Sequence, residues 1–242
     1  MVISSVENKK IKDLKKLKDK KYRDKTKTYL IEGIHLVLEA YKSGNLLEVI
    51  LEEGEDVLVD IEKTYVTNSI IKYLSELDTP YKVMGICKYT KENKDIGDRL
   101  LLLDNIQDPG NLGTIIRSSV AFNISTIILG KGCVDLYNSK VLRACQGMNF
   151  HINIIREDLI DKVKKLKEDN YKIYGTNVVN GIELKSVRNL SKYAIIMGNE
   201  GNGVSKEIQE LCDDNIYIKM NEDCESLNVA VATSIILYEL NS

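Results

Sequence analysis

Short apolar runs alternate with helical segments from Leu100 to the end of the chain. The first run is Leu100-Leu101-Leu102-Leu103, and further strands are predicted at 125–129, 152–155, 172–176 and 194–197. A strand that is apolar at every position is buried on both faces, as in a parallel sheet covered by helices. Strands that alternate with helices therefore predict an α/β domain with a mostly parallel, doubly wound sheet.

Two of the predicted strands end in polar loops that carry glycine and asparagine. The strand at 194–197 runs into a loop at 198–203, and a strand at 216–220 is followed by Ser226-Leu227-Asn228 and a helix of small residues. Glycine lets a ligand lie against the backbone, and the carboxyl ends of parallel strands meet at one edge of a sheet. Two ordinary tight turns would also fit, but the polar set Glu200, Ser226 and Asn228 favours a small-molecule site.

The junction after the first strand of this domain carries a conspicuous arginine. Asp108-Pro109-Gly110 is a turn signal, Asn111 can cap the next helix, and Arg117 lies six residues after Asn111. A helix start favours anions, so an arginine there does not complement the helix dipole. A ligand phosphate or carboxylate gripped by the guanidinium would explain Arg117, and a surface or ion-paired arginine is the alternative.

The N-terminal arm is basic although the whole chain is slightly acidic. Residues 1–27 hold eleven Lys or Arg against four Asp or Glu, a net charge of +7, so the remainder carries −9 of the total of −2. A basic arm on an acidic body suggests a polyanion such as RNA as partner, and a solvated lysine helix is the alternative. The candidate RNA contacts are Lys9, Lys10, Lys12, Lys15, Lys16 and Arg23.

Residues 28–87 read as a small α/β unit of short strands and helices. One of its strands is predicted at Asp56–Asp60, and the polar segment 88–98 is interpreted as a linker. A boundary near residue 95 would separate an N-terminal domain, 1–95, from a C-terminal domain, 96–242.

Composition narrows the class of protein. No apolar run approaches the roughly 20 residues of a membrane span, and the N-terminus lacks the apolar core of a signal peptide. The five cysteines at 87, 133, 145, 212 and 224 form no C-x-x-C pair, which argues against a disulfide framework and a structural zinc site. Phosphate-loop and dinucleotide fingerprints are absent. We expect a reduced, cytoplasmic protein without a membrane segment or a metal.

Three motifs together resemble a known family. They are Asn111-x-Gly113-x-x-x-Arg117, Gly198-x-Glu200-x-x-Gly203 and Ser226-Leu227-Asn228-x-x-x-Ala232. This combination resembles the SpoU (TrmH) family of RNA ribose 2′-O-methyltransferases in the SPOUT superfamily. The N-terminal region resembles, more weakly, the ribosomal L30e-like domain with which many members bind RNA.

The resemblance implies a homodimer whose C-terminal domain is tied in a trefoil knot. S-adenosylmethionine would be the cofactor, with its adenine held by backbone groups of Gly198, Ile218 and Leu227. The implied cofactor-binding residues are Thr176, Asn177, Met197, Gly198, Asn199, Gly201, Ile218, Met220, Ser226 and Leu227.

The resemblance also makes Arg117 the central catalytic residue. Some schemes use this arginine as a base, but a guanidinium gives up its proton reluctantly, so we favour a grip on the RNA phosphate beside the target ribose. Asn111, Glu200, Ser226 and Asn228 would position Arg117, the ribose and the RNA, and no metal is needed.

Ribosomal RNA is the favoured substrate. A tRNA methyltransferase and a non-catalytic RNA-binding protein that keeps the fold are the alternatives. One segment, 143–150, departs from the pattern of relatives, and its Gln146 and Asn149 are expected to alter a loop near the cofactor pocket.

Overall fold

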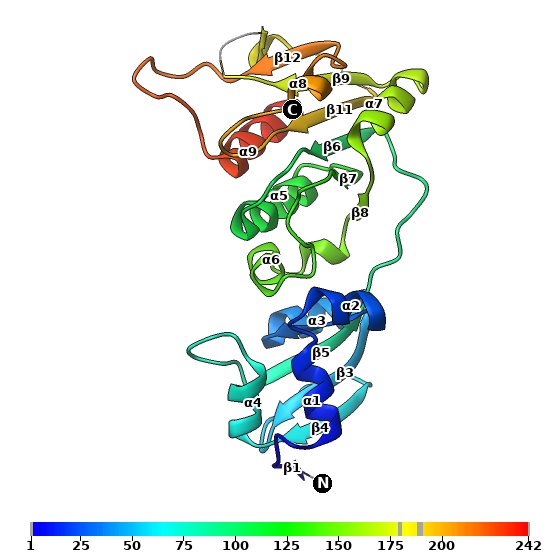
Figure 1. Cartoon of the computed structure of the whole chain (residues 1–242), viewed down its shortest axis with the longest axis vertical. Coiled ribbons are helices and arrows are strands. Elements are labelled where there is room, and N and C mark those ends of the chain that lie inside the picture. The colour runs from blue at the N-terminus through cyan, green and yellow to red at the C-terminus, as the bar shows by residue number, and fades with distance from the viewer. Residues whose placement is uncertain (1, 179–180, 188–190, 242) are drawn as a thin grey trace. The chain divides into compact units, whose positions relative to one another are not determined.

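The computed structural model describes residues 2–178, 181–187 and 191–241, and it separates into two compact units (Figure 1). Unit 1 consists of residues 1–91 together with 135–151, and unit 2 consists of residues 92–134 together with 152–242. Each unit has its own sheet and its own hydrophobic core.

Unit 1 contains a mixed five-stranded sheet. Its strands are β1 (Val2–Ile3), β2 (Thr28–Glu32), β3 (Leu46–Glu52), β4 (Glu62–Val66) and β5 (Val83–Lys88), in the order β1-β4-β3-β5-β2. Strand β4 pairs in parallel with β1 and β3, whereas β5 pairs antiparallel with β2 and β3.

Helices cover both faces of this sheet. On one face α1 (Lys9–Lys16) and α4 (Asn68–Leu74) share a core with Ile50, and on the other α3 (Ile34–Lys42) packs over Val49 and Leu51. Successive side chains of a strand point to opposite faces, so one strand supplies both cores. Helix α2 (Lys20–Thr26), helix α6 (Ser139–Cys145) and the 3₁₀ turn η1 (Met148–Phe150) complete the unit.

Segment 135–151 belongs to unit 1 although it lies inside the region predicted to form the second domain. Tyr137 and Leu142 are buried in the core that contains Tyr29. Asp135 accepts a hydrogen bond of 2.6 Å from Arg23, in an ion pair whose side chains are 7% and 17% exposed. Burial of these apolar side chains attaches the segment to unit 1, a partner that periodicity along the chain does not reveal.

One predicted strand of unit 1 is wrong. Residues 56–60 form no strand, although Val57 and Val59 are buried in the unit 1 core. Their alternating burial mimics the period of a strand, but no neighbouring strand pairs with them.

Unit 2 contains a seven-stranded sheet in which every pair of neighbours is parallel. The order is β10-β12-β9-β11-β6-β7-β8. The bounds are β6 (Arg99–Leu103), β7 (Thr126–Leu129), β8 (Asn153–Arg156), β9 (Lys172–Thr176), β10 (Ile182–Glu183), β11 (Tyr193–Met197) and β12 (Asp214–Tyr217). The predicted α/β class and the mostly parallel sheet are confirmed.

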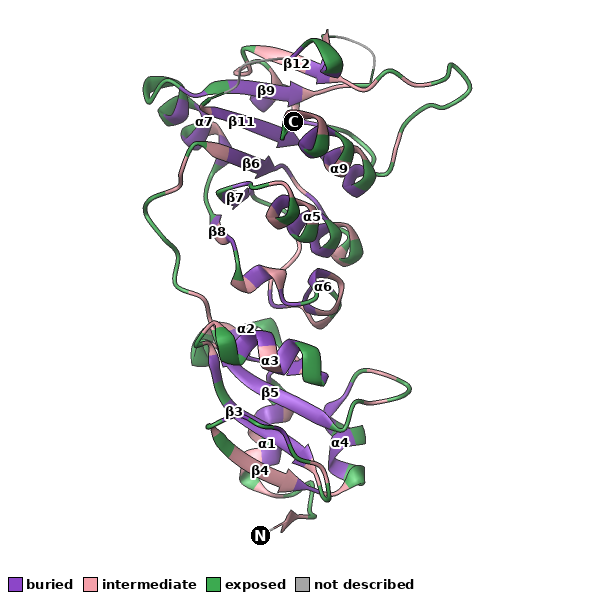
Figure 2. Cartoon of the chain, turned by 180° about the vertical axis from the view of Figure 1, so that it is seen from behind, coloured by how far each residue is buried: buried purple, intermediate pink, exposed green. Residues whose placement is uncertain are grey.

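Helices also cover both faces of this second sheet (Figures 1 and 2). Helices α5 (Pro109–Ala121) and α9 (Val229–Leu240) pack together on one face, and α7 (Leu159–Glu168) and α8 (Lys206–Gln209) lie on the other. The side chains of Leu100, Leu101, Leu102 and Leu103 are fully buried, as expected for a central parallel strand. The 3₁₀ turn η2 (Leu184–Ser186) contacts α9.

None of the helices described in 2–178, 181–187 and 191–241 combines the length and apolarity needed to cross a bilayer.

Candidate functional site

Four strands of unit 2 send their following loops to the same edge of the sheet. Strands β6, β9, β11 and β12 are parallel neighbours or near neighbours, so their carboxyl ends lie together. This edge is where open α/β sheets bind ligands, because loops from several strands can surround one crevice.

A cavity of about 470 Å³ lies at this edge. All the residues that the sequence assigned to the cofactor line it, and so do Glu200 and Asn228 from the catalytic set. The shared lining residues are Thr176, Asn177, Met197, Gly198, Asn199, Gly201, Ile218, Met220, Ser226 and Leu227. Residues of the second and third motifs, together with the end of β9, therefore surround one space.

The loop after β11 folds back sharply on itself. Asn199 and Gly203 exchange two backbone hydrogen bonds, each of 2.9 Å. A Cβ atom on Gly198 would lie 2.0 Å from the backbone carbon of Gly203, whereas a Cβ on Gly201 would meet nothing closer than 3.6 Å. The close approach at Gly198 requires glycine, and it holds the loop against the cavity.

Hydrogen bonds to the loop after β6 fix this turn in place. The Asp104 carboxylate accepts a hydrogen bond of 2.8 Å from the backbone N–H of Ser205. The Asn199 side-chain amide donates to the Asn105 carbonyl at 2.9 Å, while its oxygen accepts from the N–H groups of Gly201 and Asn202. The two loops thus form one hydrogen-bonded unit.

Glu200 extends the same network toward α5. Its carboxylate accepts from the Asn111 side-chain amide at 3.0 Å and from the N–H of Asp108 at 3.2 Å. Partial burial raises the pKa of Glu200, but these bonds and one from the N–H of Gln107 outweigh it, and the pKa lies below its ordinary value. Hydrogen bonds to the charged form keep this carboxyl ionised at neutral pH.

Asn111 and Asn228 meet although the sequence separates them widely. The Asn228 side-chain amide donates to the Asn111 side-chain oxygen at 2.9 Å, and Asn228 also caps α9 by accepting from Ala230 and Val231. The predicted helix cap at Asn111 is wrong, because α5 begins at Pro109 and its cap is Asp108, whose carboxylate accepts from the Asn111 N–H. The Asn111 side chain is consequently free to link the loops.

Arg117 lies on α5 and does not line the cavity. Its side chain is exposed, and within the part of the chain that the structure describes it makes no hydrogen bond or ion pair. An exposed guanidinium on the helix that also carries Asn111 can receive an anion from solution.

The structure adds residues to the cavity that the sequence prediction did not include. Val178, Gln209, Ile216 and Ile236 line it, and none of them lies in a recognisable motif. Gln146 and Asn149, which were expected near the pocket, lie in unit 1 and do not line it. Asn149 is instead buried, and its side-chain oxygen accepts a hydrogen bond from the Cys145 thiol at 3.1 Å.

The candidate RNA contacts all lie in α1 and α2 of unit 1, but they differ in their surroundings. Lys9 makes no ion pair among the described residues, whereas Lys10 pairs with Glu48, Lys12 with Glu7 and Lys16 with Asp13. Burial and the neighbouring Lys18 lower the pKa of Lys15 to about 8. Arg23 is buried in its pair with Asp135.

The cavity has the chemistry of a site for a small polar molecule with an apolar ring. Apolar side chains such as Met197, Ile218 and Leu227 alternate with glycine backbone and amide groups, and Glu200 is the one charged residue among the described residues that line it. Across the same described residues, no group of three or more His, Cys, Asp or Glu could hold a metal ion.

Comparisons with known proteins show to which family the chain is similar. The model of the SpoU rRNA Methylase family matches residues 98–238, and the model of the MRM3-like substrate binding domain matches residues 8–85. The chain is similar to the 23S rRNA (guanosine(2553)-2′-O)-methyltransferase RlmP of Bacillus subtilis strain 168, with 40% identity over 243 aligned positions and 98% of both chains covered.

Solved structures resemble the whole chain as well. An RNA methyltransferase of the TrmH family from Porphyromonas gingivalis superposes with a TM-score of 0.87 at 28% identity, covering 97% of this chain and 98% of the other. An AdoMet-bound rRNA methyltransferase from Sinorhizobium meliloti gives a TM-score of 0.87 at 28% identity, covering 99% and 96%.

Proposed function

The chain belongs to the SpoU rRNA methylase family, and from this premise we propose that it methylates a ribose 2′-hydroxyl of 23S ribosomal RNA. It is an RNA methyltransferase whose cofactor is S-adenosylmethionine. The observation that carries the proposal is the cavity at the edge of the parallel sheet, where residues of the second and third motifs face each other and Glu200 links them to the first.

The choice of substrate has two supports. The Bacillus subtilis relative, similar over nearly the whole chain, acts on 23S rRNA by its name. Residues 8–85 of unit 1 match a substrate-binding domain model, so both the catalytic and the RNA-binding parts agree with an enzyme of this kind.

The residues of the cavity fit the cofactor. We propose that the backbone of Gly198, Ile218 and Leu227 holds the adenine, and that Met197 and Met220 pack against it. The carboxylate of Glu200 places a negative charge at a cavity whose described lining residues include no cation, which suits a sulfonium cation. When bound, S-adenosylmethionine supplies a methyl group that its sulfonium has already activated.

The chain's own residues must orient the ribose hydroxyl and ease the loss of its proton. We assign Arg117 to the RNA phosphate beside the target ribose, where its guanidinium donates two hydrogen bonds and stabilises developing negative charge. The connected side chains of Asn111, Glu200 and Asn228 hold the surrounding loops in position. Ser226 lines the cavity beside them and is assigned to the ribose.

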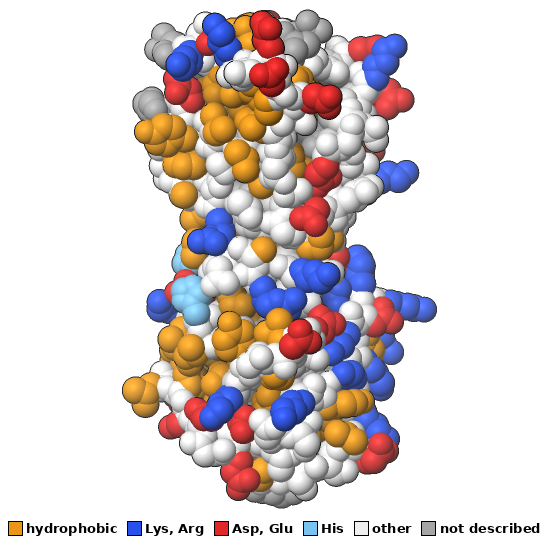
Figure 3. Space-filling view, turned by 90° about the vertical axis from the view of Figure 1, so that its left-hand side faces the viewer, with side chains coloured by type: hydrophobic (Ala, Val, Ile, Leu, Met, Phe, Trp, Pro, Cys, Tyr) orange, Lys and Arg blue, Asp and Glu red, His pale blue; other side chains and the backbone are white. Residues whose placement is uncertain are grey.

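The proposal includes a homodimer formed through α9. This helix exposes Val231, Ile235 and Tyr238, which are 48%, 38% and 65% exposed and lie on one face at helical spacing. The face of the molecule shown in Figure 3 carries groups of hydrophobic side chains between charged ones. Exposed apolar patches mark interaction sites, and a second copy would cover this face of α9 symmetrically.

RNA binding, topology and location complete the proposal. Lys9, Lys10, Lys12, Lys15 and Lys16 of α1 would neutralise RNA phosphates. A trefoil knot is consistent with the chain passing from β12, the second strand from the edge of the sheet, to α9, which packs beside α5. A force–extension measurement should give an unfolded contour shorter than the full chain if the knot is present.

We assign the protein to the cytoplasm, where ribosomal RNA meets S-adenosylmethionine.

Methyl transfer from S-adenosylmethionine carrying a labelled methyl group to 23S rRNA tests the central proposal. The reaction should proceed in chelator, and the label should map to a 2′-hydroxyl. Calorimetry should give one S-adenosylmethionine site per chain. A well-folded protein that binds S-adenosylmethionine but methylates tRNA and not 23S rRNA would overturn the substrate, and the absence of binding heat would overturn the cofactor site.

A further inference from the structure

Unit 1 contains a second cavity, formed by residues that play no part in the proposed methyl transfer. It has a volume of about 80 Å³ and is open to solvent on one side, so that a bound molecule can extend beyond it. Its apolar walls include Leu30 of β2, Leu74 of α4, Met84 of β5 and Leu142 of α6. Segments distant in the sequence therefore build one partly open pocket in unit 1, and its lining residues from β2, α4 and β5 lie in the stretch that matches a substrate-binding domain model.

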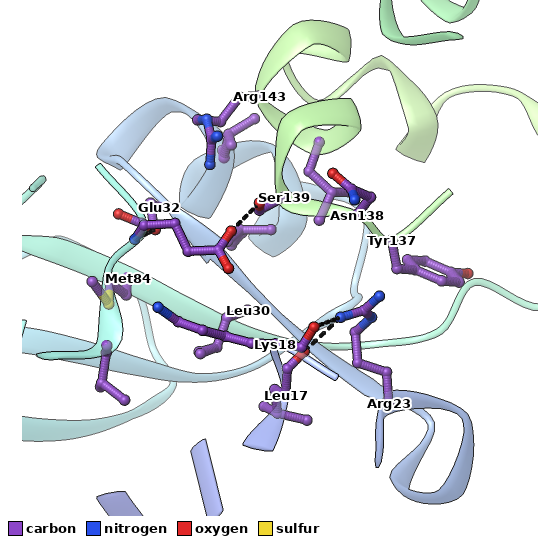
Figure 4. Close-up of a pocket in the computed structure, with 15 residues that line it drawn as sticks. Leu17, Lys18, Arg23, Leu30, Glu32, Met84, Tyr137, Asn138, Ser139 and Arg143 are labelled. Carbon is purple, nitrogen blue, oxygen red and sulfur yellow. Dashed lines mark hydrogen bonds between the residues drawn. The ribbon is translucent and has the colours of Figure 1, made fainter. Parts of the chain in front are cut away.

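Positively and negatively charged side chains also line the cavity. Lys18, Glu32, Glu76 and Arg143 all line the cavity. Figure 4 shows Arg143 and Lys18 approaching it from opposite sides. Glu32 accepts hydrogen bonds from Ser75 Oγ at 2.6 Å and from the Glu76 N–H at 3.3 Å, and Glu76 accepts one from the Ser139 hydroxyl.

Two of these groups have capacity left for a ligand. The Arg143 guanidinium makes no hydrogen bond or ion pair with any residue in the described ranges, and Glu32 has no cationic partner there. A carboxylate offers about four acceptor positions, so Glu32 can accept further N–H groups. A guanidinium can donate two parallel bonds to a phosphate.

Arg23 makes one wall of the cavity rigid. Its guanidinium donates to the carbonyl oxygens of Leu17 at 2.8 Å and Lys18 at 2.7 Å, and it is paired with Asp135 at 2.6 Å. These bonds join the chain between α1 and α2 to the segment that leads into α6. Because Arg23 is buried, it shapes the cavity rather than meeting RNA at the surface.

The apolar walls, the Arg143 guanidinium and the carboxylates together favour one class of ligand. A free phosphate would meet two carboxylates, and a purely apolar molecule would leave Arg143 and Glu32 without partners. A nucleotide satisfies all of them, because its base has apolar faces and an edge of N–H groups, and its phosphate is an anion. Guanine presents two adjacent N–H groups, which match the two oxygens of a carboxylate.

We propose that this cavity binds one unpaired guanine nucleotide of the RNA substrate, with the base edge on Glu32 and the phosphate on Arg143. The inference rests on the proposed function for the identity of the RNA, but the site itself can be tested without methyl transfer. It would give unit 1 a means of recognising a particular nucleotide, since proteins read RNA sequence mainly at unstacked bases.

The first experiment is a calorimetric titration of the full-length protein with guanosine 5′-monophosphate. S-adenosylhomocysteine is present in excess, so that the cavity of unit 2 is filled. We expect one guanosine monophosphate per chain, and weaker binding by about tenfold or more in Arg143→Gln and in Glu32→Gln, as expected for the loss of a charge-assisted hydrogen bond. Uridine 5′-monophosphate should bind more weakly.

The matched control is Lys140→Gln, which removes an exposed charge from the same helix, α6. It should bind guanosine monophosphate like the wild type, and thermal melting should show that all variants are folded. Equal affinities in the wild type, Arg143→Gln and Glu32→Gln, or no binding by the folded wild type, would overturn the site. Equal affinities for the guanosine and uridine nucleotides would overturn the assignment of guanine.

The second experiment separates recognition of RNA from chemistry. In steady-state methylation, Arg143→Gln and Glu32→Gln should raise the KM for RNA with kcat and the affinity for S-adenosylmethionine unchanged. A fall in kcat at unchanged KM would contradict a recognition site. If the wild type transfers no methyl group at all, the proposed function fails, whereas the nucleotide titration still decides whether the cavity is a binding site.

Discussion

The Asn228 side chain donates a hydrogen bond of 2.9 Å to the Asn111 side chain, although 117 residues separate the two in the sequence. Asn111 in turn donates to Glu200, so the starts of α9 and α5 and the loop after β11 are joined by consecutive hydrogen bonds. All three motifs of the sequence meet in these two contacts. A substitution at any one of the three side chains should therefore disturb the others.

Glu200→Gln should alter the pH dependence of stability. Partial burial raises the pKa of Glu200, but hydrogen bonds from Asn111 and from backbone N–H groups outweigh it, so the pKa lies below its ordinary value of 4.5. A depressed carboxyl pKa stabilises the folded state above the unfolded pKa, and this is lost as the pH falls through the folded pKa. The wild type should thus exceed the variant in free energy of unfolding at neutral pH, and the difference should shrink below pH 4.5.

Urea unfolding of both proteins across this range measures the effect. Glu207→Gln, an exposed change on α8, is the control and should leave the profile unaltered. A difference between wild type and Glu200→Gln that stays constant down to the lowest pH would contradict the assignment.

Gly198→Ala should weaken S-adenosylmethionine binding far more than Gly201→Ala. The new Cβ at 198 would lie 2.0 Å from backbone atoms of Gly203 and Val204, whereas the one at 201 meets only a side-chain oxygen at 3.6 Å. The backbone of the loop must move in the first variant, and we expect at least about a tenfold loss of affinity by calorimetry, or about 1.4 kcal/mol. Equal affinities in the two variants would show that the tight turn is not needed.

Arg117→Ala should abolish methyl transfer with little change in S-adenosylmethionine binding. Arg117 does not line the cavity, and its exposed guanidinium is available to an RNA phosphate. Lys164→Ala, which removes an exposed cation from α7 of the same unit, should remain active. A rate in Arg117→Ala above about a tenth of wild type, equivalent to about 1.4 kcal/mol of barrier, would exclude a central role.

Ile235→Glu should convert a dimer into a monomer. Ile235 is 38% exposed beside Val231 and Tyr238 on α9, and a charge placed in an apolar interface loses its hydration without gaining a partner. Light scattering at micromolar concentration measures the mass. Leu58→Glu, at a residue that is 94% exposed in unit 1, is the matched control and should leave the mass unchanged. A monomeric wild type would exclude the proposed dimer.

Replacing Lys9, Lys12 and Lys16 by Gln should weaken RNA binding and flatten its dependence on salt. Lysines that neutralise phosphates release counterions, so each lost contact reduces the slope of log affinity against log salt by about one. Changing Lys164, Lys165 and Lys206 to Gln removes the same charge from exposed positions of unit 2 and should have a smaller effect. If the slope of log RNA affinity against log salt concentration is the same in the two triple variants, the lysines of α1 are a solvated surface and do not contact RNA.

Much of unit 2 could be predicted from the sequence. The run Leu100–Leu103 is apolar at every position, and only a strand covered on both faces buries such a run, so the parallel sheet follows from local composition. The motif residues at 197–201 and 226–227 were placed in one pocket by resemblance, and the structure brings them to a common cavity. Their binding of cofactor stays a prediction.

Other features were decided only by tertiary structure. The sequence marks Leu142 and Tyr137 as apolar residues that could be buried in either core. Only the three-dimensional packing shows that they belong to the core of unit 1. Val57 and Val59 show the period of a strand but pair with no neighbour, and Arg23 reads as a surface cation but is buried against Asp135. Periodicity along a chain reports which side of an element is buried. It does not report which distant segment covers that side, because that choice depends on packing between residues that only folding brings together.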